Sequence, residues 1–189
     1  MTEAQHILAA AAGRRNGARF ALALALGLRQ GEALGLQWRD VDLDRGTLSV
    51  RRAIQRLVWQ HGCGGTCGRK RGADCPGRHG GGLVVAEPKS RSGRRVVGLP
   101  AELVAALRAH RETQDAEREL AADLWHDGGW VFAQPTGKPT DPRADYAEWQ
   151  ALLKTAGVRR ARLHDARHTA ATMLLVLKVP TRAVMDVMG

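Results

Sequence analysis

The sequence predicts an α+β fold that is mainly α-helical, with a small three-stranded antiparallel sheet. Two observations support this fold class. Apolar residues recur at helical spacing in several stretches of ten or more residues, and three shorter stretches have the composition of β-strands. At 189 residues the chain has the size of one ordinary domain and is long enough to bury a core.

The chain is expected to begin with a short helix over residues 2–12, which Thr2 can cap. A turn at 13–17 then leads into a buried helix over residues 18–28. The alternation of Ala and Leu in this stretch also fits a strand. Its length and the poor strand propensity of alanine favour a helix.

The predicted strands lie in the middle of the chain, after a turn at residues 42–46. They cover residues 47–58, 82–87 and 94–99, where β-branched residues are frequent. Residues 88–93 are short and polar, and we expect them to form the tight connection between the last two strands.

The second half is expected to be helical. An amphipathic helix begins at Pro100 and becomes charged and exposed toward Glu119. A loop rich in Gly and Pro follows at 128–140, with Trp-Val-Phe as a buried anchor, and helices are predicted over 141–156 and 164–177. A last helical turn ends near Met188.

Charge is unevenly distributed along the chain. Residues 51–95 contain eleven Lys or Arg and two acids, a net charge of +9, whereas the remainder has eighteen basic and seventeen acidic residues. Such a localised cationic block indicates a polyanionic partner. The longest apolar run, residues 20–28, is too short to span a bilayer, and no targeting segment is visible, so we expect a cytoplasmic protein without a membrane partner.

One stretch combines an arginine, a glycine and a glutamate at the end of a helix. Arg29 follows the apolar helix, the chain is expected to break at Gly31, and a new helix starts through Glu32. Arg29 and Glu32 stand three residues apart and can form an ion pair, which would fix the arginine rotamer. Alone, such a pair is more typical of a surface salt bridge.

Two later stretches change this interpretation. They are PKSRSGRR at residues 88–95 and HDARHT at 164–169. In order and spacing, the three stretches resemble the catalytic domain of the tyrosine recombinases, or phage-type integrases. G-L-R-x-G-E is similar to the first-arginine box of this family, Lys89 to its hairpin lysine, and H-x-x-R-H-T to its second-arginine box. The resemblance covers essentially the whole chain and is to integrases of the actinobacterial type with a Cys-rich insertion.

The resemblance implies site-specific DNA recombination or integration on double-stranded DNA. A tyrosine attacks a scissile phosphodiester, forming a 3′-phosphotyrosyl link and a free 5′-hydroxyl, without a catalytic cofactor. It implies that Arg29 and Arg167 stabilise the phosphate and that His164 donates to it or handles the nucleophile's proton. It also implies that Lys89 protonates the leaving oxygen. Rigid cations suit this step because charge builds on the non-bridging oxygens.

The chain departs from the family pattern at both ends. We expect residues 1–189 to be a partial catalytic domain, without the N-terminal core-binding domain and truncated before the nucleophilic tyrosine. Tyr146, the one tyrosine present, precedes the helix of Arg167 and is expected to be a half-buried helix residue. This fragment is therefore expected to be inactive alone, while the full-length protein would form a homo-oligomer on DNA.

Basic side chains expected to contact DNA lie in the cationic block and its insertion. They are Arg51, Arg52, Arg69, Lys70, Arg71, Arg91, Arg94 and Arg95. Two other functions remain open. The chain can be a non-cleaving DNA-binding remnant or regulator, or the HDARH segment can be the His164–His168 pair of a metal hydrolase.

The insertion at residues 61–82 is rich in Gly and Arg and has too few apolar residues to bury a core. It carries a Cys₃His set suited to structural zinc, and His61 is a competing ligand. The set is Cys63, Cys67, Cys75 and His79. The alternative is a flexible basic loop without metal.

Overall fold

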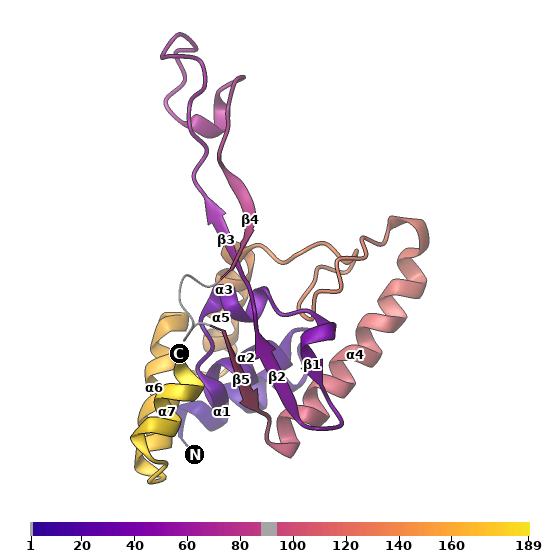
Figure 1. Ribbon diagram of the computed structural model, residues 1–189, viewed down its shortest axis with the longest axis vertical. Coiled ribbons are helices and arrows are strands. Elements are labelled where there is room, and N and C mark those ends of the chain that lie inside the picture. The colour runs from indigo at the N-terminus through magenta and orange to yellow at the C-terminus, as the bar shows by residue number, and fades with distance from the viewer. Residues whose placement is uncertain (1, 88–93) are drawn as a thin grey trace.

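The computed structural model describes residues 2–87 and 94–189 and confirms a mainly helical α+β fold with small antiparallel sheets (Figure 1). The α-helices are α1 (Glu3–Ala12), α2 (Gly17–Leu26), α3 (Gln30–Leu34), α4 (Ala101–Ala121), α5 (Pro142–Thr155), α6 (Leu163–Val176) and α7 (Thr181–Met188). The strands are β1 (Val41–Asp42), β2 (Thr47–Val50), β3 (Ala53–Leu57), β4 (Gly82–Ala86) and β5 (Arg95–Gly98). No helix in these described ranges is long and apolar enough to cross a membrane.

The strands form two separate antiparallel sheets. A three-stranded sheet has the order β1-β2-β5, and β3 and β4 form a two-stranded ribbon that projects from the helical body (Figure 1). The predicted three-stranded sheet is thus present, but its membership was wrong. The predicted strand 47–58 splits into β2 and β3 at Arg51 and Arg52, which both form ion pairs with Asp40.

The expected break at Gly31 is wrong, because the chain turns four residues earlier. Gly27 adopts a left-handed conformation with φ of 60° and ends α2, which an L residue would do at a steric cost. Gly31 instead lies inside α3, where an added Cβ would stand 2.7 Å from the carbonyl oxygen of Ile54. This close approach seats α3 against β3. Arg29 becomes the residue that precedes α3.

The core consists of two apolar clusters that share α2. One lies between α2, α3, the three-stranded sheet and α4, with Leu22 and Leu34 fully buried. The other joins α1, α2, α5 and α6, where the rings of Phe20 and Trp149 stand 5.7 Å apart. Since α2 contributes to both clusters, the loop that follows it is held firmly in place.

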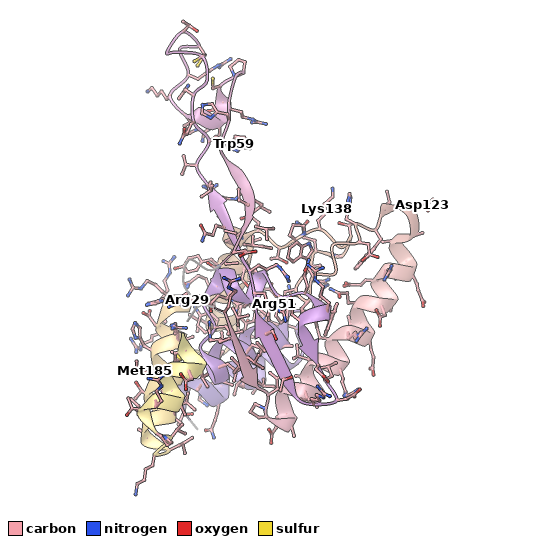
Figure 2. All side chains as sticks on the ribbon, viewed as in Figure 1. Arg29, Arg51, Trp59, Asp123, Lys138 and Met185 are labelled. Atoms are coloured by element: carbon pink, nitrogen blue, oxygen red, sulfur yellow. The ribbon has the colours of Figure 1, made fainter. Side chains whose placement is uncertain are left out.

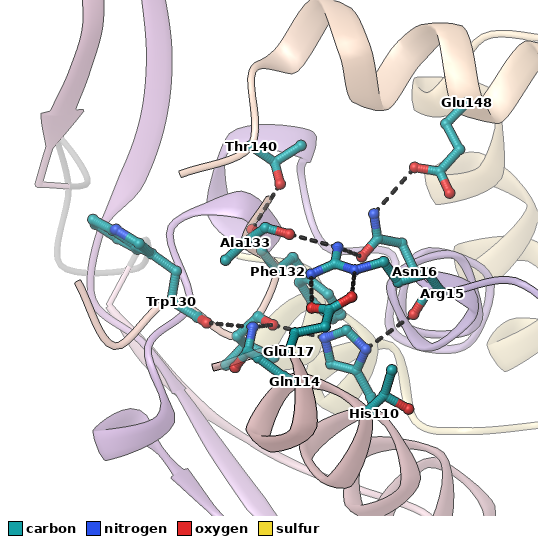
Figure 3. A network of polar contacts seen from close by, with 12 residues as sticks. Arg15, Asn16, His110, Gln114, Glu117, Trp130, Phe132, Ala133, Thr140 and Glu148 are labelled. Carbon is teal, nitrogen blue, oxygen red and sulfur yellow. Dashed lines mark hydrogen bonds and ion pairs between the residues drawn. The ribbon is translucent and has the colours of Figure 1, made fainter. Parts of the chain in front are cut away.

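A polar network holds the segment before α5 against α4 (Figure 3). The ring of His110 lies between two backbone carbonyls, 3.0 Å from that of Arg15 and 2.7 Å from that of Val131. Burial of His110 lowers its pKa below the ordinary value. Val131 and Phe132 are fully buried beside it, which confirms the predicted apolar anchor.

Candidate functional site

A buried carboxylate organises the site. Glu32, at the start of α3, accepts a hydrogen bond from the Nη1 of Arg29 on Oε1 at 2.8 Å. Its Oε2 accepts from the Nη2 of Arg95 and from the backbone N–H of Arg29, both at 3.0 Å. Burial opposes its ionisation, but the hydrogen bonds from Arg95 and then Arg29 outweigh burial and hold the pKa of Glu32 below its ordinary value. The carboxylate is therefore charged and fixes Arg29.

Two guanidinium groups converge on one oxygen atom beside this carboxylate. The Nη2 of Arg29 donates to the main-chain oxygen of Gly189 at 2.9 Å, and the Nη2 of Arg167 donates to the same oxygen at 3.2 Å; in the 189-residue chain this atom is a carboxylate oxygen. Arg167 also donates to the carbonyl of Gly27 at 2.7 Å and to that of Met188 at 2.6 Å. Burial, and next the charge of Arg29, lower the pKa of Arg167. The pair is a preorganised site for an oxygen that carries negative charge.

A groove opens beside the two arginines. It is lined by Leu28, Arg29, Gln30, Tyr146, Arg162, Leu163, His164 and Arg167. His164 is exposed in this groove, and its ring meets that of His168 edge-on, with centroids 4.7 Å apart. Tyr146 is 38% exposed, close to the half-buried position expected for it, and it shares the groove with the arginines.

Three of the arginines expected to face DNA differ in how far their side chains are exposed. Arg95 departs from that expectation, because its side chain is only 7% exposed and binds Glu32 and the backbone carbonyl of Val187. Arg52 is also largely covered and pairs with Asp40. Arg51 is 65% exposed, 3.4 Å from the same carboxylate.

Those of the remaining expected contacts that the structure describes lie on the projecting ribbon or near its base. Arg94 is 58% exposed and stands 3.6 Å from Glu87. A second groove passes between the ribbon base and β5, and its lining includes Arg51, Arg52 and Arg94. Exposed cations also occur farther out on the ribbon, at Arg69, Lys70 and Arg71. Lys89 and Arg91 lie outside the described residues.

Sequence reasoning missed a buried charged network behind the site. Arg19 in α2 and Asp145 in α5 are almost fully buried, with Nη2 and Oδ2 3.2 Å apart. Asp145 also accepts a hydrogen bond from Gln30 at 2.8 Å, and Gln30 directly follows Arg29. The sequence feature that could have revealed this network is the arginine within the apolar run of α2. A buried cation requires a partner, so its presence there predicts a buried carboxylate nearby.

The insertion brings four potential metal ligands together, and one of them is not the residue favoured above. Ligand atoms of His61, Cys63, Cys67 and Cys75 all lie within 4.8 Å of one another. The Nδ1 of His61 is 3.4 Å from the sulfur of Cys67 and 3.9 Å from that of Cys63. Hydrogen bonds, first with Cys67 and then with His61, lower the pKa of Cys63 to about 5.

The structure thus brings His61, and not His79, together with the three cysteines. The backbone of His79 forms two hydrogen bonds with that of Gln60, which extend the ribbon beyond β3 and β4. This pairing places His79 opposite Gln60, outside the cluster, whereas His61 follows Gln60 into it. Within residues 2–87 and 94–189, the group that can hold a metal ion is this one, and neither His164 nor His168 belongs to it.

Comparison with known sequences places these features in a wider context. The model of the phage integrase family matches residues 78–189. An integrase from Saccharopolyspora erythraea is 49% identical, over 98% of this chain and 49% of that relative. A tyrosine recombinase XerC-like protein from Caldanaerobacter subterraneus is 31% identical, over 99% of this chain and 45% of that relative. The chain thus spans about half the length of the curated relatives it matches.

Solved structures share the fold. XerA recombinase matches with a TM-score of 0.66 at 22% identity, covering 99% of this chain and 53% of that one. The Tn1549 transposon integrase, in complex with a circular intermediate DNA, matches with a TM-score of 0.70 at 20% identity, covering 97% of this chain and 54% of that one. At such identities the likeness concerns the fold.

Proposed function

The chain belongs to the phage integrase family, the tyrosine recombinases, and from this premise we propose that it is the catalytic domain of an enzyme that cleaves and rejoins DNA at specific sites. One observation carries the proposal: Arg29 and Arg167 donate to a single oxygen atom. A non-bridging oxygen of a scissile phosphate would take this position. Two fixed cations there would stabilise the charge that develops during attack.

The other groups have roles that their positions support. Glu32 holds Arg29 in place, so little reorganisation is needed when the phosphate binds. His164 lies in the same groove as the arginines and can donate to the phosphate or exchange the proton of the attacking hydroxyl. Lys89 is proposed, by resemblance alone, to protonate the leaving 5′-oxygen.

Partners and location follow from the proposed activity. Double-stranded DNA is the proposed substrate, supported by the cationic block and by DNA complexes of structural neighbours. Recombination exchanges strands between two DNA sites, so we propose that the full-length protein forms a homo-oligomer on DNA and acts in the cytoplasm. Contacts to phosphates are assigned to exposed arginines such as Arg51 and Arg94.

A nicked duplex that traps cleaved strands tests the proposal. Residues 1–189 alone are expected to bind it without a covalent adduct, because the groove tyrosine, Tyr146, precedes α6 and the family nucleophile follows it. The same chain, extended by any tyrosine-bearing sequence encoded after Gly189, should form an adduct. Arg29→Ala should abolish that adduct, and Tyr146→Phe should leave it intact.

Two outcomes would contradict this assignment. An adduct of the 189-residue chain mapped to Tyr146 would identify a different nucleophile. Salt-dependent DNA binding without any adduct from the extended chain would favour a non-cleaving DNA-binding protein.

We also propose that the insertion holds one structural zinc ion through His61, Cys63, Cys67 and Cys75. In a tetrahedral zinc site with the usual bond lengths, nitrogen and sulfur ligands stand about 3.5 Å apart. The observed separations of 3.4 and 3.9 Å lie on either side of that value. Zinc would supply folding free energy to a segment that cannot bury an apolar core.

Variants of the two histidines test the ligand set. His61→Ala should reduce zinc, measured by elemental analysis of purified protein, from about one ion per chain to well below it. His79→Ala is the matched control and should retain zinc. The reverse result would restore the spacing-based set, and a wild-type protein without zinc would exclude the metal.

A further inference from the structure

The far end of the β3–β4 ribbon is a separate structural unit, and it contains a cluster of basic side chains. We call residues 59–81 the ribbon head. Figure 2 shows Trp59 far out on the ribbon, whereas Arg29 lies in the helical body. The head has four basic residues and one acid, a net charge of +3 with neutral histidines.

We propose that the ribbon head is a second DNA-contacting surface, organised by the metal site, that binds phosphates outside the region held by the Arg29–Arg167 site. The proposal rests on the DNA and zinc binding proposed above. It adds where the second contact lies, which residues make it and why it depends on metal.

The base of the ribbon is fixed to the body near the site, so the direction of the ribbon is set by the fold. Gly31 of α3 and Gly35, which follows it, lie very close to the chain at the start of the ribbon. A Cβ on Gly31 would stand 2.7 Å from the backbone oxygen of Ile54, and a Cβ on Gly35 would stand 2.7 Å from that of Arg52, just before β3. Arg56 of β3 forms an ion pair with Asp141, the residue that caps α5. The base of the ribbon therefore contacts α3, which Arg29 precedes, and the start of α5, the helix whose Tyr146 lines the groove beside Arg29.

The length of the ribbon sets the reach of the head. Pairing runs from Ala53, opposite Ala86, to Gln60, opposite His79. Seven residue steps at about 3.3 Å per residue give roughly 23 Å. At about 3.4 Å per base pair, this distance corresponds to at most about seven base pairs of duplex beyond the ribbon base.

Two side chains of the head are available to phosphates. Arg69 and Lys70 are exposed and form no ion pair within the described residues. Arg71 differs, because it binds Asp74 at 2.9 Å. Arg78 lies over the ring of Trp59, at 4.9 Å from its centroid, and so supports the head itself.

Metal binding would organise this surface by holding its ends. Arg69 and Lys70 lie between Cys67 and Cys75, which are both candidate ligands, and this loop includes Gly68 and Gly72. Glycine-rich loops lose much conformational entropy on ordering, and zinc would supply that ordering before DNA binds. Charge would not favour DNA binding in this state, since one Zn²⁺ with three thiolates carries a net charge of −1. A gain of DNA affinity on metal binding would therefore reflect ordering.

The experiment measures the dependence of affinity on salt for the zinc-loaded 189-residue chain and a 40-base-pair duplex. Each phosphate contact contributes about 0.9 to the slope of log affinity against log salt, so Arg69→Ala/Lys70→Ala should lower the slope by about 2. Between 50 and 200 mM salt this difference corresponds to about a tenfold smaller loss of affinity. Cys67→Ser should lose zinc and show a similar decrease in slope.

The matched control removes two exposed cations, one in the turn between β1 and β2 and one at the start of α7, and both of these segments lie at the end of the body away from the ribbon (Figure 1). Arg45→Ala/Arg182→Ala changes the net charge equally and should keep the wild-type slope. A wild-type slope in the Arg69/Lys70 variant, with zinc retained, would overturn the second surface and leave the proposed function intact. A wild-type slope in zinc-free Cys67→Ser would overturn the role of metal. A wild-type chain insensitive to salt would overturn DNA binding altogether.

Discussion

Arg29 and Arg167 donate hydrogen bonds to the same main-chain oxygen, although one precedes α3 and the other lies in α6. Burial, and next the repulsion from the like charge of Arg29, lower the pKa of Arg167. Glu32 offsets part of this repulsion by binding Arg29 and Arg95.

Replacing the central carboxylate should destabilise the fold. Glu32→Gln removes the charge that compensates buried Arg95, and breaking one partner of a buried ion pair typically lowers the free energy of unfolding by about 3–5 kcal/mol. Urea denaturation would measure the loss. Glu119→Gln, at an exposed position of α4, should stay within about 0.5 kcal/mol of wild type. Equal effects of the two changes would contradict the role assigned to Glu32.

The Arg19–Asp145 pair should show strong coupling. Asp145→Asn leaves the Arg19 charge buried without compensation and should also cost about 3–5 kcal/mol. The double variant Arg19→Met/Asp145→Leu should recover much of that loss, since apolar replacements of a buried pair are often neutral. A double-mutant cycle with the single variants Arg19→Met and Asp145→Leu, measured by urea denaturation, checks this. Additive losses would mean that the two side chains act independently.

Gly31 should resist substitution despite its place in a helix. Ala would raise helix propensity by about 1 kcal/mol, but its Cβ would stand 2.7 Å from the backbone oxygen of Ile54. The clash should dominate, with a net loss of about 1–3 kcal/mol in thermal or urea unfolding. Gly13→Ala, where nothing lies within 4 Å of the new Cβ, is the matched control and should be nearly neutral. A stabilised Gly31→Ala would show that α3 and β3 are farther apart.

His110 should make stability depend on pH below neutrality. Because burial lowers its pKa in the folded state, the unfolded chain takes up a proton more readily, with an ordinary pKa of about 6.5. The free energy of unfolding should therefore fall as pH drops below about 6.5. Denaturation midpoints between pH 7.5 and 5.5 would show this. His110→Gln should have a lower midpoint and a flatter pH profile, and an unchanged profile would place the dependence elsewhere.

Much of the fold could be predicted from local patterns. The helix predicted over 141–156 appears as α5, Pro142–Thr155, because Asp141 caps it and proline favours its first turn. The position of the break after α2 was missed, because both Gly27 and Gly31 could end a helix. The structure shows that Gly31 is needed for the close approach to β3, while Gly27 ends the helix. Tertiary contacts of this kind leave no signal in the local sequence.

The candidate site shows the same division. Motif spacing identified Arg29, His164 and Arg167, which the structure brings to one groove. Charge counting placed Arg95 on the DNA, because it cannot reveal that the partner of this arginine is Glu32, 63 positions away. The choice of His61 over His79 depends on strand register across the ribbon, which the spacing of cysteines does not specify.

The hydrogen bond from Arg167 to the carbonyl of Gly27 joins residues 140 positions apart. On a ribosome adding about 5–20 residues per second, roughly 7–28 s separate the synthesis of these two residues. In the second half of that interval the emerging chain already carries Arg29 and the cationic ribbon but still lacks Arg167. Under the proposed function, a nascent chain would be attracted to nucleic acid before it could hold a phosphate between two arginines.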